Sequence, residues 1–200
     1  VRDEVEKILL TRSPEMVYTL IELGLLDAFL KKRMPEPWRL HRLGSIQRKA
    51  MPRWAALCCA LEKFGCIDSA EEFLAALRLD SRTIRCCSNA EVLVKQPKPA
   101  DKAAWKRALC AYGVDSVSCA AQCYDAFSGG GSARELRAVL KSGECFSMKH
   151  LAVTGDDLLE LGLRGRELGD MLRFLLDYVM EYPANNRREL LLTLARGTEE

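Results

Sequence analysis

Hydrophobic residues recur along much of this chain at the three- and four-residue spacing of amphipathic helices. The longest such pattern covers residues 165–182, where Leu168, Leu172, Leu175 and Val179 fall on one helical face. No window of five residues shows the β-branched alternation that is typical of a half-buried strand. The pattern therefore predicts an all-α fold, in which a multi-helix body bundle is followed by a helical tail domain.

Polar residues and glycines mark the expected ends of these helices. Four residues are placed as N-caps: Ser69, Asp101, Ser132 and Thr154. Thr154 and Asp157 also have the spacing of a capping box, in which each side chain accepts a hydrogen bond from the backbone N–H of the other residue. Gly113 and Gly143 follow two of the helical patterns and predict where those helices stop.

Two segments interrupt the helical pattern. Residues 95–99 hold two prolines, which favour a linker, and residues 128–132 form a glycine-rich loop. We place a domain boundary at the first segment and predict domains at residues 1–97 and 98–200. The second segment is predicted to be a loop within the second domain.

Composition narrows the class of protein. Of the 200 residues, 48% are hydrophobic, and 30 basic against 28 acidic residues give a net charge of +2. No apolar run approaches the ~18 residues that a membrane span requires, so we expect no membrane partner. The charges are nevertheless segregated, because residues 31–53 carry eight basic residues and one acid while residues 154–181 carry seven acids and three basic residues. Such segregation is compatible with a phosphate-binding patch and equally with a solvated face.

Nine cysteines are many for a chain of this length. No Cys-x-x-Cys pair occurs and neither histidine lies near a cysteine pair, so the spacing predicts no metal site. We interpret Cys58, Cys59, Cys110 and Cys119 as small hydrophobic core residues. Directly adjacent cysteines do not suit a disulfide framework, which favours a reducing, cytoplasmic location.

The sequence holds no recognisable catalytic motif. The nucleophile-elbow, zinc-protease and P-loop patterns are absent, and no Asp-x-Asp pair is available to hold catalytic metal ions. We therefore predict no catalytic residue and no metal ligand in this chain.

Glycines and arginines meet at the expected start of the helix over residues 165–182. The free N–H groups of a helix N-terminus favour an anion, so Gly165 between Arg164 and Arg166 predicts a phosphate cradle. Gly169 lies one turn inside the helix, where a glycine is costly, and we interpret it as a site of close helix packing.

Several stretches of the chain resemble bacterial CCA-adding enzymes, which are tRNA nucleotidyltransferases of the poly(A) polymerase superfamily. Residues 1–9 are similar to the family's neck helix, residues 20–30 to its neck–body junction and residues 53–57 to the body helix that follows. The resemblance to the tail is carried by Phe146–Leu158, Leu161–Leu163, Gly165–Gly169, Leu172–Leu176, and by Pro183, Asn186, Arg188, Glu189 and Leu190. The sequence departs from the family at Arg164, where a proline often stands, and at Arg166, where one sometimes does. Residues 98–132 match no motif.

The resemblance implies that residues 1–97 are the end of the neck with the body, and that residues 98–200 are a tail that contacts tRNA. In the family, the full-length enzyme adds the 3′-terminal CCA of tRNA from CTP and ATP with Mg²⁺. The Asp-x-Asp motif of the catalytic head and the Glu-Asp-x-x-Arg motif of the neck do not occur here. We therefore expect a C-terminal portion that is inactive by itself, holds no cofactor of its own, and belongs with an N-terminal catalytic head in a full-length parent.

Body and tail are expected to hold the acceptor stem and the elbow of tRNA. The residues that we predict to contact RNA are Arg48, Lys49, Arg53, Lys149, Arg164, Gly165, Arg166 and Arg173. Arg2, Glu4 and Lys7 are predicted to be structural remnants of the neck. Exposure of Val5, Ile8 and Leu9 on the same segment would favour a homodimer. The alternative hypothesis is a helical protein–protein interaction module that binds no RNA.

Overall fold

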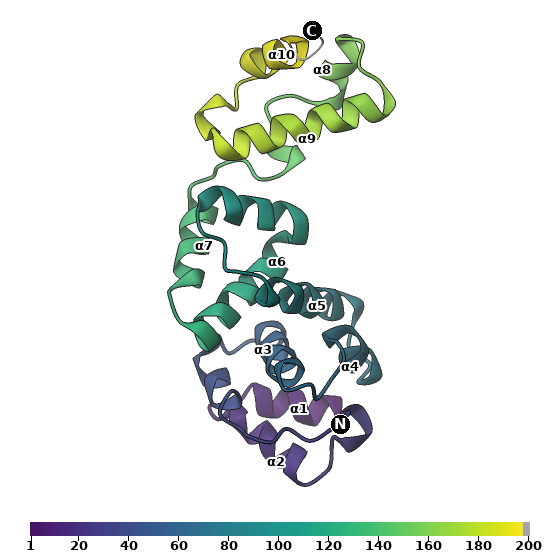
Figure 1. Cartoon of the computed structure of the whole chain (residues 1–200), viewed down its shortest axis with the longest axis vertical. Coiled ribbons are helices and arrows are strands. Elements are labelled where there is room, and N and C mark those ends of the chain that lie inside the picture. Colours follow the sequence, from purple (N-terminus) through teal and green to yellow (C-terminus); the bar gives the residue numbers. More distant parts are fainter. Residues whose placement is uncertain (198–200) are drawn as a thin grey trace. The chain divides into compact units, whose positions relative to one another are not determined.

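The computed structural model describes residues 1–197, which form ten α-helices, five short 3₁₀ helices and no strand. The predicted all-α class is confirmed for this part of the chain (Figure 1). The helices are α1 (Arg2–Leu9), α2 (Val17–Glu22), α3 (Ala50–Lys63), α4 (Ala70–Ala76), α5 (Ser81–Lys95), α6 (Lys102–Ser128), α7 (Ser132–Lys141), α8 (Gly155–Glu160), α9 (Gly165–Glu181) and α10 (Arg188–Gly197). None of them is long and apolar enough to cross a membrane.

The chain packs as two compact units. Unit 1 comprises residues 1–98 and 112–136, and the described part of unit 2 comprises residues 99–111 and 137–197. The chain thus leaves unit 1 next to the boundary that we expected at residue 97. Residues 112–136, however, which we expected in the second domain, pack with unit 1. Residues 198–200 of that expected domain lie outside the described part of the chain.

Unit 1 is organised around α3, which packs against α1, α4 and α5. Every residue from Pro52 to Leu61 is buried, so this helix has no solvent-facing side over that stretch. Alanines and cysteines make up much of it, and their small side chains let neighbouring helices approach closely. Val5 and Leu9 of α1 are fully buried, and Ile8 is half-buried. The exposure that we expected to favour a homodimer is therefore wrong.

Glycine ends a helical run inside α6. Gly113 has a φ of +79° and ψ of 161°, so the two parts of α6 meet at a non-helical residue, as its sequence position predicts. The chain passes from unit 2 to unit 1 at this point.

The start of α7 is capped differently from our prediction. The Asp125 carboxylate accepts hydrogen bonds from the backbone N–H groups of Ser132 and Ala133, the latter at 3.0 Å. The Ser132 hydroxyl is buried and has no hydrogen-bond partner. A carboxylate from α6 therefore satisfies the N–H groups that we had assigned to the Ser132 side chain.

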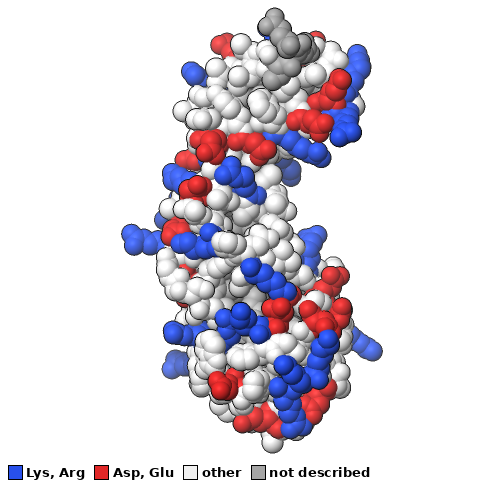
Figure 2. Space-filling model, viewed as in Figure 1, with Lys and Arg blue, Asp and Glu red and all other residues white. Residues whose placement is uncertain are grey.

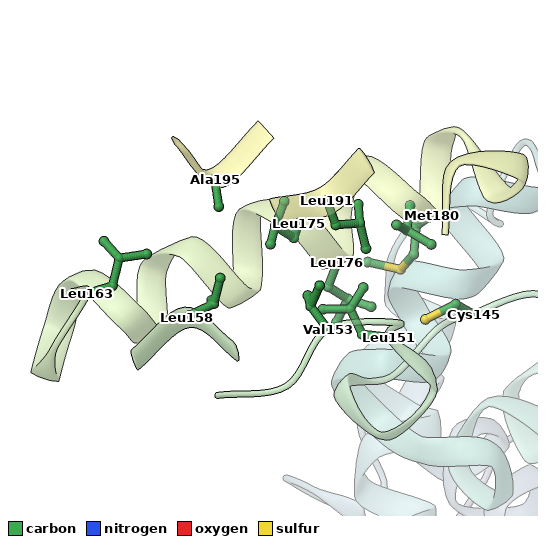
Figure 3. Close-up of a cluster of buried hydrophobic side chains, with 11 residues drawn as sticks. Cys145, Leu151, Val153, Leu158, Leu163, Leu175, Leu176, Met180, Leu191 and Ala195 are labelled. Carbon is green, nitrogen blue, oxygen red and sulfur yellow. The ribbon is translucent and has the colours of Figure 1, made fainter. Parts of the chain in front are cut away.

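Unit 2 has its own hydrophobic core, to which α8, α9 and α10 all contribute (Figure 3). The 17-residue helix α9 supplies Leu175, Leu176, Val179 and Met180 from the face that its periodicity predicts. The other members are Cys145, Leu151, Val153, Leu158, Leu163, Leu191 and Ala195. The short helices α8 and α10 are held on α9 by this shared burial, since helices of 6 and 10 residues are marginal alone.

Candidate RNA-binding surface

The capping box at the start of α8 is formed as predicted. The Thr154 hydroxyl accepts from the Asp157 backbone N–H at 3.3 Å, and the Asp157 carboxylate accepts from the Thr154 backbone N–H at 2.7 Å. The other oxygen of Asp157 accepts from the Arg188 guanidinium of α10, with Nε at 3.1 Å. The Thr154 backbone hydrogen bond and then Arg188 lower the pKa of Asp157 to about 2. One carboxylate thus both caps α8 and ties it to α10.

The start of α9 is open by comparison. Arg164 occupies the N-cap position in an extended conformation, with φ −142° and ψ 156°, and its side chain caps no backbone N–H. Gly165 follows with a φ of +55°, which other residues rarely adopt. The first N–H groups of this 17-residue helix are therefore left without a side-chain partner, at the end where the helix dipole is positive. This arrangement suits a phosphate group.

Arginine side chains flank this helix end. Arg164 is exposed and forms no ion pair with any described residue. The side chain of Arg166 is 94% exposed, and its ion pair with Asp170 is long, at 3.4 Å. Arg173 shares the same Asp170 at 3.5 Å and is 76% exposed. Such exposed pairs contribute little, so all three guanidinium groups can turn to an external phosphate.

Gly169 does not mark a helix contact. A Cβ atom added there would meet nothing within 4 Å, so the close packing that we expected at this residue is wrong. Lys149 lies in a short 3₁₀ helix (Met148–His150), is exposed, and likewise has no charged partner among the described residues.

Two further exposed cations of unit 2 escaped the sequence analysis. Arg137 and Lys141 lie four residues apart on α7, so they project from the same side of that helix. Neither pairs with an acid in the described part of the chain. Their four-residue spacing within a helical pattern is the sequence signal that marks them.

The basic stretch over residues 31–53 is largely occupied with internal contacts. Lys31 pairs with Asp68, and Arg33 with Asp27 at 2.6 Å. Arg39 packs its guanidinium against the rings of Trp38 and Phe127, at 5.3 and 4.9 Å. On the face drawn in Figure 2, basic and acidic residues are interspersed. On this face, the segregation of charge along the sequence does not produce a separate basic patch.

The structure corrects the predicted RNA contact of Arg53. Only 3% of the residue is exposed, and its guanidinium donates to three backbone carbonyls: those of Leu9, Thr11 and Ile46. It fastens the end of α1 to α3 and has no surface left for a phosphate. Its neighbour Arg48 is exposed but also donates to a backbone carbonyl, that of Leu10.

The remaining predicted positions of unit 1 are on the surface. Lys49 is exposed at the N-cap position of α3 and has no charged partner among residues 1–197. Glu4 and Lys7 pair with each other at 2.7 Å on the exposed side of α1. Arg2 pairs with Asp3 and donates to the carbonyl of Arg78 at 3.1 Å. All of these contacts are made within unit 1.

The described residues contain no group of three or more His, Cys, Asp or Glu side chains that is arranged to hold a metal ion.

Comparison with known proteins places the chain in a family. It matches the solved structure of the Bacillus stearothermophilus CCA-adding enzyme in complex with CTP with a TM-score of 0.75 and 22% sequence identity, over 99% of this chain and 51% of that one. At this identity the match shows a shared fold, and the chain spans about half the length of that enzyme. No curated protein matches the chain. The family model described as tRNA nucleotidyltransferase domain 2 matches residues 48–195, which is most of the chain. The chain belongs to this tRNA nucleotidyltransferase domain 2 family.

Proposed function

We propose that this chain binds tRNA, and that in a longer protein it holds the acceptor stem and elbow while a separate catalytic head adds the terminal CCA. The observation that carries the proposal is the uncapped N-terminus of α9, where free backbone N–H groups, Gly165 and two exposed arginines lie together. Membership of the tRNA nucleotidyltransferase domain 2 family supports tRNA as the partner.

The proposed contact recognises the RNA backbone. A-form helices are recognised mostly by shape and by phosphate and 2′-hydroxyl contacts, and a helix N-terminus flanked by guanidinium groups fits a phosphate without reading a base. Arg173, Lys149, Arg137 and Lys141 add exposed positive charge from the same unit. Of the three RNA-contact residues predicted in unit 1, Lys49 and the exposed part of Arg48 remain in the proposed contact.

The test is fluorescence anisotropy of the 200-residue chain with a labelled tRNA that lacks its CCA end, at several salt concentrations. Arg166→Glu is expected to weaken binding by about tenfold, because a hydrogen bond to a charged group contributes about 1.5 kcal/mol. The slope of log affinity against log salt concentration should become shallower by about 1, which is the contribution of one phosphate contact.

Arg187→Glu is the matched control, since it makes the same charge change within unit 2. Arg187 is exposed and follows the C-terminal end of α9. That end lies about 22 Å along the helix from Arg166. Equal losses in the two variants would mean that overall charge, rather than the start of α9, governs binding. No salt-dependent binding by the unaltered chain would overturn the proposal and favour an interaction module without RNA.

A further inference from the structure

Two cysteines that are far apart in the sequence meet inside unit 1. Cys86 on α5 and Cys119 on the second part of α6 have their sulfurs 3.7 Å apart. Both residues are buried, with exposed fractions of 3% and 4%. Their separation of 33 residues means that only the tertiary fold brings them together.

The pair is not sealed off from solvent. Cys86 lines a surface pocket of about 210 Å³, whose other walls include Arg82, Arg85, Gly113 and Ser116. Cys119 is not among the lining residues, so Cys86 is the member of the pair that a small molecule in the pocket can approach. The space accommodates a hydroperoxide readily.

The surroundings of the two sulfurs differ in a way that distinguishes their roles. The hydrogen bond shared with Cys119 lowers the pKa of Cys86, and Ser116 acts in the same direction, while burial opposes both. The same hydrogen bond raises the pKa of Cys119. The buried neighbour Cys87 behaves as an ordinary core thiol, because burial raises its pKa. Since the thiolate is the reactive form, Cys86 is the more nucleophilic member of the pair.

We propose that Cys86 and Cys119 form an oxidisable dithiol, which a hydroperoxide converts to a disulfide. In the first step the Cys86 thiolate attacks one peroxide oxygen, the O–O bond breaks, and a sulfenic acid forms at Cys86 as hydroxide leaves and takes up a proton. In the second step the Cys119 sulfur attacks the Cys86 sulfur, the S–O bond breaks, and water leaves with the Cys119 proton. Two thiols lose two electrons and two protons, and hydrogen peroxide is reduced to two molecules of water.

The new bond would join α5 to α6 and enclose the stretch in which the chain leaves unit 1 and returns. Residues 99–111 of this stretch belong to unit 2, and the chain re-enters unit 1 at residue 112, next to Gly113. A disulfide between residues 86 and 119 would therefore close a loop around residues 99–111 and restrict the conformational freedom of this stretch in the unfolded chain. A reductant would reverse the change.

Cys110 is exposed, so its expected place in the core is wrong. The experiment therefore uses the 200-residue chain with Cys110→Ser, because this exposed thiol would otherwise cross-link different molecules. The protein is treated with hydrogen peroxide, its free thiols are alkylated, and tryptic peptides are analysed by tandem mass spectrometry with and without reductant. Cleavage after Arg85, Lys95, Arg107 and Arg134 places Cys86 and Cys119 on separate peptides. We expect a reducible link between these two sulfurs and a loss of about 2 Da from the intact chain, which is the two hydrogens of the thiols.

Two variants identify the sulfurs. Cys119→Ser should abolish the link and leave a sulfenic acid at Cys86 that dimedone traps. Cys66→Ser is the control, since Cys66 is a buried cysteine of unit 1 with no sulfur partner in the described structure, and it should leave the link intact. The peptide map of the Cys110→Ser chain with both Cys86 and Cys119 present still tests the link if the Cys119→Ser variant folds poorly.

The proposal is overturned if peroxide oxidises Cys110 of the unaltered chain while Cys86 and Cys119 are both recovered alkylated. It is overturned equally if the link joins Cys87 or Cys123 instead, or if it persists in Cys119→Ser.

Discussion

Replacement of Arg53 by methionine tests whether this arginine is a structural fastener. Its guanidinium serves the carbonyls of Leu9, Thr11 and Ile46, and only 3% of the residue is exposed. Methionine keeps much of the apolar stem but leaves three inward-facing carbonyls without a donor. Hydrogen bonds to charged groups contribute about 1.5–3 kcal/mol each, and part of that is recovered as the end of α1 relaxes into water, so we expect a loss of about 4 kcal/mol.

Urea unfolding followed by tryptophan fluorescence measures this loss, because Trp38 and Trp54 belong to unit 1 and Trp105 to unit 2. With a slope of about 2 kcal/mol/M, the midpoint should fall by about 2 M. Arg48→Met is the matched control, since Arg48 also donates to a carbonyl near the end of α1 but is exposed. Its cost should be about 0.5 kcal/mol, as for other surface substitutions. Similar midpoints for the two variants would refute the assignment of Arg53 to the core.

The remaining predictions concern unit 2. Because the pKa of Asp157 is about 2 in the folded chain against an ordinary value of 3.8, its ionised form stabilises the fold above that ordinary value, and the contribution is lost as the pH falls from 3.8 to 2. Asp157→Asn should remove this component from urea midpoints measured across that range, and an unchanged pH profile would contradict it. Lys106 is 1% exposed and donates to Glu144 at 2.8 Å, so Glu144→Gln leaves a buried charge unpaired and should cost about 3 kcal/mol in thermal unfolding. The double variant with Lys106→Met should recover most of that loss, and simple additivity would argue against coupling. Gly165→Ala should destabilise by about 1 kcal/mol because of the positive φ, whereas Gly169→Ala should stabilise by about 1 kcal/mol in open space inside α9. A stabilising Gly165→Ala would show that the helix start is not held in that conformation.

The features that sequence analysis predicted correctly are those with short-range causes. The capping box of Thr154 and Asp157, the cap of Ser69 on the Glu72 N–H at 3.2 Å, and the helix break at Gly113 each depend on residues within a turn of one another. The apolar stripe of α9 is equally local, since a single helix period determines which side chains share a face.

The candidate site was only partly predictable, because only some of its features have short-range causes. Arg164, Gly165 and Arg166 are neighbours in sequence, so their meeting at a helix start follows from the pattern alone. Whether a cation is available to a ligand depends on partners elsewhere in the chain. The buried Arg53 and the exposed Arg166 look alike in the sequence, and only the packing of α1 against α3 separates them.

The sequence by itself determined the helical class, most helix ends and the glycine–arginine start of α9, because hydrogen bonds and side-chain periodicity within a few residues specify them. Only the tertiary structure decided that Asp125 caps α7, that residues 112–136 belong to unit 1, and that Cys86 meets Cys119. Each of these joins segments separated by loops, and their meeting depends on which apolar faces bury one another. That choice is made by the summed packing of the whole core rather than by any local pattern.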